Sequence, residues 1–306
     1  MNWINAFELL CYGITAALLT DILTGKRWDE FRLFCSAALA GFILELLAVR
    51  VTGIYHYSTD FYLNIGFAPY QFPFFGGLMW GGLTVCALRL ARKFGADRLT
   101  TALLSGWLLV SMDLLLDVAA IRLNGGFWVW EGREITLDVT HHMFMSVIWV
   151  NFLGYMFETP AVVWFTLKAE ANGKKKTPLT RIGQTVLIGL GGVAVVGAAS
   201  GISLFLNGVT DEWFSCAAFV LLWGFIAVRL GTLLFKRRKT LIIRRRGDIV
   251  PLMFWTVMYG YCLAALGHLG ILVDVPLYAV FAILLAALTF LLCLLREKRT
   301  ILEEIE

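Results

Sequence analysis

The sequence predicts an all-α polytopic membrane protein with about nine transmembrane helices, and two observations lead to this fold class. The chain has 306 residues, of which 59% are hydrophobic and only 16% are charged, whereas an average soluble domain carries about 25% charged residues. Apolar runs of about 20 residues, long enough to cross the hydrocarbon core of a bilayer as a helix, recur along the whole chain. The composition therefore excludes a soluble globular class.

Nine apolar segments are the candidate spans. In chain order they lie at roughly residues 4–23, 31–49, 74–91, 100–122, 143–167, 182–206, 214–235, 249–272 and 275–295. No lysine or arginine precedes the first segment and no small-residue cleavage site follows it, so we expect it to stay in the mature protein. The sixth segment contains five glycines that predict close packing against a neighbouring helix, among them a GxxxG step from Gly197 to Gly201. The five are Gly189, Gly191, Gly192, Gly197 and Gly201.

The distribution of cations between the connections predicts the orientation. Lysines and arginines near span ends are retained on the cytoplasmic side of a membrane. When the connections are assigned alternately to two sides, 23 of the 26 lysines and arginines fall on one side, and the other holds only Arg50, Arg122 and Arg133. We therefore expect the cell (inner) membrane, with the N-terminus outside and the C-terminus in the cytoplasm. The net charge of +4 reflects this topology, so we expect the lipid bilayer and not nucleic acid as a partner.

The polar residues divide the chain unevenly. Residues 1–168 are expected to form a five-span module that holds most of the ionisable groups found inside spans, and with them the active site. Residues 169–306 are expected to form a four-span C-terminal module, for which the sequence suggests no role. No sequence repeat relates the two parts, so an inverted-repeat transporter gains no support.

No metal site or cofactor is predicted. The six cysteines lie inside apolar segments and no CxxC occurs, so we expect neither a disulfide framework nor a cysteine metal site. His141 and His142 lie close to Asp138. Adjacent histidines would point in different directions on a helix, however, and the HxxxH and HxxHH boxes of the diiron desaturases are absent.

Polar side chains inside the spans are the strongest functional signal. An ionisable group at the centre of a bilayer costs at least about 2.5–3.5 kcal/mol, so each such group is a functional hypothesis. In the predicted topology, Glu45, Asp113, Asp117 and Asn151 all fall in the outer half of the bilayer, and Glu158 follows in the span of Asn151. Polar groups from separate spans are therefore expected to meet at one level.

The spacing of Asp113 and Asp117 indicates an acid pair. The two residues are four apart, so they share one face of a helix. Two desolvated carboxyls at that spacing are expected to keep one proton between them near neutral pH, which makes a general acid available. The alternative is structural, with each carboxylate hydrogen-bonded to a helix end or paired with Arg50 or Arg122.

Two connections on the outer side are rich in aromatic residues. The one after the second span is too apolar for a solvated loop, and the one after the fourth places tryptophans beside Glu131. Ring faces stabilise a desolvated cation by about 2 kcal/mol or more, so an aromatic pocket that contains acids suits a carbocation intermediate. The alternative is a belt of Trp and Tyr at the membrane interface. The candidate substrate-binding residues are Tyr55, Tyr57, Trp80, Trp128, Trp130 and Asn151.

The sequence also resembles a known family. Five segments in order carry the resemblance, namely ELLAVRVTGIYHY (45–57), APYQFPFFGGLMW (68–80), DLLLD (113–117), GFWVWEG (126–132) and WVNFLGY (149–155). Together they are similar to the integral-membrane carotenoid biosynthesis proteins typified by bisanhydrobacterioruberin hydratase and the bacterial carotenoid 1,2-hydratases. Tyr155 stands where that family usually has tryptophan, and the last four spans add no further match.

The resemblance implies a cofactor-independent hydratase that adds water to a terminal C=C of a long isoprenoid such as an acyclic carotenoid. Asp117 or Asp113 would protonate the alkene, and Glu45 or Glu131 would orient or deprotonate the water. The tertiary cation would be stabilised by aromatic side chains, namely Tyr55, Tyr57, Trp128 and Trp130. The alternatives are a membrane terpenoid cyclase or isomerase with the same acid, a proton-coupled transporter or lipid-binding protein, and a structural partner in an isoprenoid enzyme complex.

Overall fold

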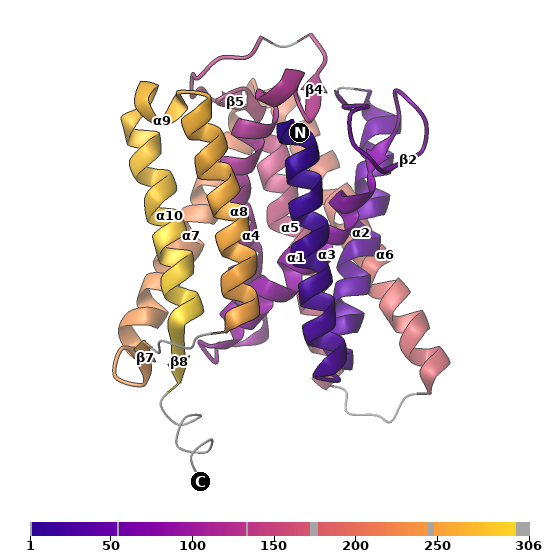
Figure 1. Cartoon of the computed structure of the whole chain (residues 1–306), viewed down its shortest axis with the longest axis vertical. Helices are drawn as coiled ribbons and strands as arrows, with labels where there is room; N and C mark the ends of the chain where they lie inside the picture. Colours follow the sequence, from indigo (N-terminus) through magenta and orange to yellow (C-terminus); the bar gives the residue numbers. More distant parts are fainter. Residues whose placement is uncertain (1, 54, 133, 172–176, 244–247, 298–306) are drawn as a thin grey trace.

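Nearly parallel helices make up most of the protein (Figure 1). The computed structural model describes residues 2–53, 55–132, 134–171, 177–243 and 248–297. The nine long helices of this part of the chain are α1 (Trp3–Thr24), α2 (Trp28–Thr52), α3 (Phe74–Arg92), α4 (Arg98–Ala120), α5 (Trp149–Ala171), α6 (Pro178–Thr210), α7 (Trp213–Arg237), α8 (Ile249–His268) and α10 (Pro276–Leu294). A one-turn helix, α9 (Ile271–Asp274), precedes the last of them. The predicted class, an all-α polytopic membrane protein, is confirmed.

Local signals explain where several helices begin. The side chains of Asn2 and Asp97 accept hydrogen bonds from the backbone N–H groups of the first turns of α1 and α4, as N-caps do. Proline occupies the first turn of α6 and of α10, where its missing N–H leaves no hydrogen bond unmade. Polar and proline residues therefore fix the ends of helices whose interiors are almost entirely apolar.

The helix α5 differs from the other long helices. Eight of the nine are long and apolar enough to be candidate membrane spans, and α5 is the exception, because its interior carries Asn151, Glu158 and Pro160. Its predicted start at residue 143 is also wrong. Residues 143–148 form a hairpin of β5 (Met143–Phe144) and β6 (Val147–Ile148), since both turn residues between these strands have positive φ angles and cannot continue a helix.

The chain alternates between the two ends of the bundle. Figure 1 places the N-terminus at one end, with β2, β4, β5 and α9, and the chain leaves at the other, beside β7 and β8. We call these the N-terminal end and the C-terminal end. Arg89 at the C-terminal end binds Glu30 and Asp21 at 2.6 and 2.8 Å, and Lys93 lies 3.2 Å from Asp248. The assignment of the N-terminal end to the outside stays a prediction. Some of the cations counted for it lie outside the described residues, namely Arg133, Lys174, Lys175, Lys176, Arg244, Arg245, Arg246, Lys298 and Arg299.

Four small antiparallel strand pairs join the connections in the described part of the chain. Besides the β5 and β6 hairpin, they pair β1 (Tyr55–Tyr57) with β4 (Trp128–Trp130), β2 (Asn64–Ile65) with β3 (Phe72–Pro73), and β7 (Leu241–Ile243) with β8 (Leu295–Glu297). The first of these pairs ties the α2–α3 connection to the α4–α5 connection, which lie about 70 residues apart in the chain. It covers the N-terminal end of the helices that carry the acids.

The core lies around α3 and α4. Almost every residue of α4 is buried, whereas α6 and α7 expose large apolar side chains, as helices facing lipid do. The close packing predicted for the glycines of α6 is confirmed at Gly189, against the backbone of α2, and at Gly192, against Val162 of α5. It is not found at the GxxxG step, because no described atom lies within 4 Å of a Cβ at Gly197 or Gly201.

The C-terminal helices join the same core. The helix α8 packs on α1, α3 and α4, and the Tyr261 hydroxyl donates a hydrogen bond to the carbonyl oxygen of Trp3 at 2.8 Å. From α10, the Tyr278 hydroxyl donates to the carbonyl oxygen of Leu114 at 2.8 Å. The division into modules at residue 168 stays a prediction.

Candidate active site

Four carboxyl groups of α2, α4 and α5 are buried inside the described part of the bundle, in addition to Glu8 of α1. Glu45 comes from α2, Asp113 and Asp117 from α4, and Glu158 from α5. Their exposed fractions are 7%, 7%, 1% and 3%. Ionisable groups are rare inside membrane proteins unless they take part in function or are paired with another polar group. The partners of these four carboxyls therefore indicate whether their role is functional or structural.

The two aspartates of α4 lie together, as their spacing predicts. Both line one cavity, and their four-residue spacing puts them on the same face of α4. The Asn151 side-chain amide of α5 donates a hydrogen bond to Oδ2 of Asp117 at 2.7 Å. In contrast, Oδ2 of Asp113 is buried without a hydrogen-bond partner. One carboxyl of the pair is thus held in place, and the other has an oxygen free for a ligand.

Cations do not neutralise these acids. Within the described ranges, no lysine, arginine or histidine forms an ion pair with Glu45, Asp113, Asp117 or Glu158. The guanidinium of Arg122 instead donates to backbone carbonyl oxygens, that of Val118 at 2.6 Å, that of Met145 at 3.0 Å and also that of Thr136. Among the described residues, Arg122 therefore does not form the ion pair with Asp113 or Asp117 that the structural alternative predicted.

An aromatic layer covers the acids at the N-terminal end. In the β1 and β4 pair, Tyr55 lies opposite Trp130 and Tyr57 lies opposite Trp128. Alternate residues of a strand share a face, so all four rings lie on the same face of the pair. The ring centroids are 5.1 Å apart for Tyr55 and Trp130 and 5.9 Å apart for Tyr57 and Trp128. Two short segments distant in the sequence thus build one aromatic surface.

Two hydroxyl groups of this layer hold Glu45. Tyr55 and Tyr57 donate hydrogen bonds to the same carboxylate oxygen, Oε2, at 2.8 and 2.7 Å. Burial and the nearby Glu45 raise the pKa of Tyr57 well above its usual value, so its hydroxyl stays protonated and donates. Glu45 is therefore positioned as a hydrogen-bond acceptor beside the aspartate pair.

A cavity of about 80 Å³ lies between these groups. Its polar lining comes from Glu45, Asp113 and Asp117, and its walls are mainly aromatic and aliphatic. Trp80 of α3 and Tyr155 of α5 meet edge to face in the wall, with centroids 4.9 Å apart. The remaining lining residues are Phe7, Tyr57, Phe72, Pro73, Phe75, Gly76, Met79, Leu83, Leu109, Leu116, Trp128 and Met258.

The structure brings most, but not all, of the candidate residues to this cavity. Tyr55 and Asn151 bind the lining residues Glu45 and Asp117, and Trp130 packs behind Tyr55. Glu131 is elsewhere. Its side chain is 59% exposed, and its Oε1 lies 2.6 Å from Nδ1 of His56, because strand alternation turns residues 56 and 131 away from the face that carries the rings.

Glu8 of α1 is a buried acid that sequence reasoning missed. It is fully buried and accepts hydrogen bonds from the backbone N–H groups of Tyr62 at 2.6 Å and Leu63 at 3.0 Å. The Tyr12 hydroxyl donates to it at 3.0 Å. Glu8 therefore anchors the α2–α3 connection over the cavity. An acidic residue inside the first apolar segment was the signal that could have revealed it.

One cluster outside the cavity could hold a metal ion. His141 and His142 approach Asp211, and ligand atoms of the three residues lie within 4.8 Å of one another. The sequence-based argument against this site assumed a helix. Residues 138–142 form no helix, and the third member of the cluster is Asp211 and not Asp138.

Comparisons with known proteins add one match. A family model described as carotenoid biosynthesis protein matches residues 5–221. The matched range runs from α1 into α7 and includes every polar residue of the cavity. No curated protein and no solved structure matches the chain.

Proposed function

We propose that this chain, which belongs to the carotenoid biosynthesis protein family, is a membrane-embedded hydratase that adds water to a terminal C=C of a long isoprenoid such as an acyclic carotenoid. Family membership supports the role in carotenoid biosynthesis, and the reaction is our inference. One observation carries it, namely three buried carboxyls around an aromatic cavity that form no ion pair with any cation of the described residues. We place the protein in the cell (inner) membrane.

The aspartate pair is the proposed acid. Two buried carboxyls that share one face of α4 and line the same cavity are stable when they hold one proton between them. Because the amide of Asn151 donates to Asp117, Asp117 is favoured as the charged acceptor of the pair. Asp113, whose Oδ2 is buried and unpartnered, is then the proton donor. It transfers the proton to the less substituted carbon of the terminal alkene and leaves a tertiary cation on the other carbon.

The surroundings of the cavity suit a cation. The aromatic side chains of Tyr57, Trp128 and Trp80 line it, and desolvated ring faces attract cations by about 2 kcal/mol or more. The aspartate pair is doubly negative after it has given up its proton, and a positive charge beside it is stabilised further. Both effects act on the cation and not on the neutral alkene, which is the condition for lowering the barrier.

Water completes the reaction. Glu45, held by the two tyrosine hydroxyls, is the acceptor that orients a water toward the cation. A C–O bond forms, the water loses one proton to the carboxyl cluster, and this proton restores the acid pair. The net change is alkene plus water to tertiary alcohol. The step needs only a proton and water, so we assign no cofactor.

The size of the cavity supports reaction at a chain end. The cavity is small, about 80 Å³, so we expect the terminus of an isoprenoid to enter it and not a whole carotenoid. The rest of the substrate would extend into the bilayer, because a hydrophobic chain partitions into its hydrocarbon core.

A cyclase or isomerase is the second candidate. The cavity is lined mostly by apolar side chains, a property that also suits water exclusion and attack by an internal alkene on the same cation. Hydration adds the mass of one water, whereas cyclisation or isomerisation leaves the mass unchanged. Product mass therefore separates the two reactions.

The test is expression of the chain in a host that accumulates lycopene and other acyclic isoprenoids, followed by mass spectrometry of the extracted lipids. We expect a product heavier by one water with the native chain and none with Asp113→Asn or Asp117→Asn. Asp97→Asn is the matched control, because it makes the same chemical change at the N-cap of α4, outside the cavity, and asparagine also caps helices.

The outcomes are distinct. A product of unchanged mass with altered retention would replace the hydratase with the cyclase or isomerase. Full activity of both cavity variants would overturn the acid assignment. Absence of any new lipid, together with proton-coupled flux in liposomes of the purified chain, would support the transporter instead.

A further inference from the structure

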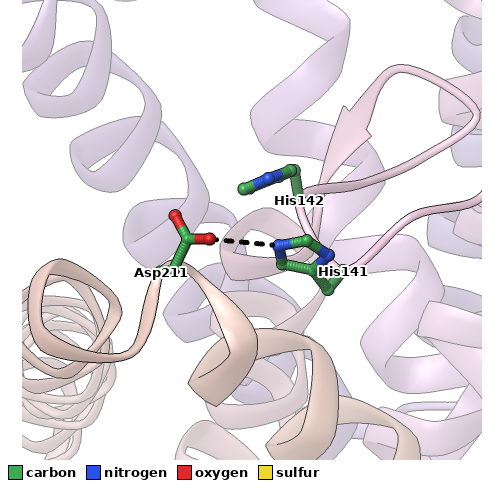
Figure 2. Close-up of side chains that lie close together, drawn as sticks. All are labelled: His141, His142 and Asp211. Carbon is green, nitrogen blue, oxygen red and sulfur yellow. Dashed lines mark ion pairs between the residues drawn. The ribbon is translucent and has the colours of Figure 1, made fainter.

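His141 and His142 lie far from the acid pair, at the N-terminal end of the bundle. They follow the aromatic strand β4 in the α4–α5 connection, and the Trp149 indole donates a hydrogen bond to the carbonyl oxygen of Thr140 at 2.7 Å. Opposite them is the two-residue turn between α6 and α7, which consists of Asp211 and Glu212. Figure 2 shows the side chain of Asp211 reaching toward the two histidines from this turn.

The backbone of the turn presents both of its carboxylates. Asp211 and Glu212 have φ angles of 50° and 64°, in the left-handed region that non-glycine residues seldom adopt. Such residues cost about 1–3 kcal/mol each and are frequent at ligand sites. In this conformation Asp211 Oδ2 lies 3.6 Å from Nε2 of His141, and Glu212 Oε2 lies 3.1 Å from Nδ1 of His142.

The distance between His141 and Asp211 suits a shared ion better than a direct hydrogen bond. A separation of 3.6 Å is too long for a good hydrogen bond, and Nε2 of His141 is buried without a hydrogen-bond partner. Two ligand atoms about 2.1 Å from one tetrahedral ion are about 3.4 Å apart. The rings of His141 and His142 have centroids 3.8 Å apart, so both imidazoles can reach the same point.

Neighbouring side chains hold the two rings. The His141 ring stacks on Trp213 with an interplanar angle of 4° and a centroid distance of 4.5 Å. Glu212 contacts one nitrogen of His142, the arrangement by which a carboxylate orients a metal-binding imidazole. Asp211 is 82% exposed at its side chain, so an ion from solution can reach the cluster.

We propose that His141, His142 and Asp211 bind a divalent transition-metal ion, and that Glu212 orients His142. Two imidazoles and a carboxylate are ligands typical of Zn²⁺, which we expect as the native ion. The ion would clamp the α4–α5 connection, which carries Trp128 and Trp130 over the cavity, to the α6–α7 hairpin. The site is separate from the cavity, so its test does not depend on the proposed reaction.

The experiment measures metal on the full chain in detergent. The chain is purified through a tag without histidine. The chain has only four histidines, and metal bound to a histidine tag would mask metal bound at the proposed site. Elemental analysis should find about one zinc per chain in the native protein and less than a tenth of that in His141→Gln/His142→Gln. His56→Gln is the matched control. It removes a histidine that also touches a carboxylate, Glu131, but has no second histidine beside it, and we expect it to keep the zinc.

Two further measurements keep the proposal falsifiable when a variant folds poorly. Zinc removed with a chelator should lower the unfolding temperature of the native chain, and added Zn²⁺ should restore it. Glu212→Gln, which keeps all three ligands, should weaken Zn²⁺ binding about 10–100-fold. Another first-row metal at one per chain that is lost in the double variant would support the same site. No bound metal together with no response of the native chain to added Zn²⁺ would overturn it.

Discussion

The helices α4 and α6 are both candidate spans, yet they have opposite surroundings. In the most apolar window of α4, 94% of the residues are buried, against 17% for α6. Only α4 carries acids in its interior, Asp113 and Asp117, and it is enclosed by α3, α5 and α8. The comparison teaches that an apolar segment can serve either as the wall of a site or as its lipid-facing support. Charged side chains mark the first kind, because protein and not lipid surrounds them.

The largest effect is expected from the substitution that disrupts the acid pair on α4. Asp113→Asn removes the proposed proton donor, and general acid catalysis contributes about 10²–10⁴-fold, so we expect turnover to fall by that factor. The measurement is product formation per milligram of membrane protein. On α6, Ser203→Ala removes a buried hydroxyl that bonds only to its own helix, and this variant should keep native turnover. Equal losses in the two variants would contradict the distinction between the helices.

The next effect weakens the aromatic layer above the acids. Tyr57→Phe keeps the ring that lines the cavity but removes the hydrogen bond to Glu45. A hydrogen bond to a charged group contributes about 1.5–3 kcal/mol, so we expect turnover to fall about 10-fold or more. Tyr12→Phe is a useful control, because this hydroxyl also donates to a buried glutamate, Glu8, outside the cavity lining. Turnover of Tyr57→Phe at the native level would remove Glu45 from the mechanism.

A pair of glycine substitutions tests the packing difference directly. A Cβ at Gly106 of α4 would lie 2.5 Å from Cγ of Pro160 on α5, whereas nothing lies within 4 Å of a Cβ at Gly197 of α6. Gly106→Ala should lower the free energy of unfolding by about 1–3 kcal/mol through overpacking. Gly197→Ala should raise it by up to about 1 kcal/mol through helix propensity. Thermal unfolding in detergent measures both, and the same sign in both variants would contradict the packing described for the two helices.

The smallest expected effect is at Glu131. Its carboxylate lies against His56, on the face of the strand pair that points away from the cavity. Surface substitutions change stability by about 0.5 kcal/mol or less, a factor of about 2, so Glu131→Gln should change turnover by less than about 2-fold. The assay is the same product measurement. A loss as large as that of Asp113→Asn would return Glu131 to the site.

Local patterns predicted much of this protein. The length of the apolar segments predicted the spans. The four-residue spacing of Asp113 and Asp117 predicted that both would lie on the same face of one helix, and both line one cavity. The sequence also contained the signal that Glu131 points away from the site, because Trp128 and Trp130 alternate with Val129 and Glu131 in WVWEG. The sequence-based prediction placed Glu131 in the site because it did not consider strand alternation.

Contacts between distant segments could not be predicted in this way. Nothing local in YHY or WVW specifies that these strands pair, because their register is set by the helices that bring them together. The approach of Asp211 to His141 also joins residues 70 positions apart, through the meeting of the α4–α5 connection with the α6–α7 turn.

The polar interior of α5 has a consequence for how the protein enters the membrane. A membrane-insertion machine partitions each helix according to its own apolarity, and one glutamate at the helix centre costs several kcal/mol in that step. With Asn151, Glu158 and Pro160 in its interior, α5 is expected to insert poorly alone and to need the surfaces of α4 and α6, on which it packs. The proposed acid site between α4 and α5 would then be assembled during synthesis, as a condition of insertion and not after it.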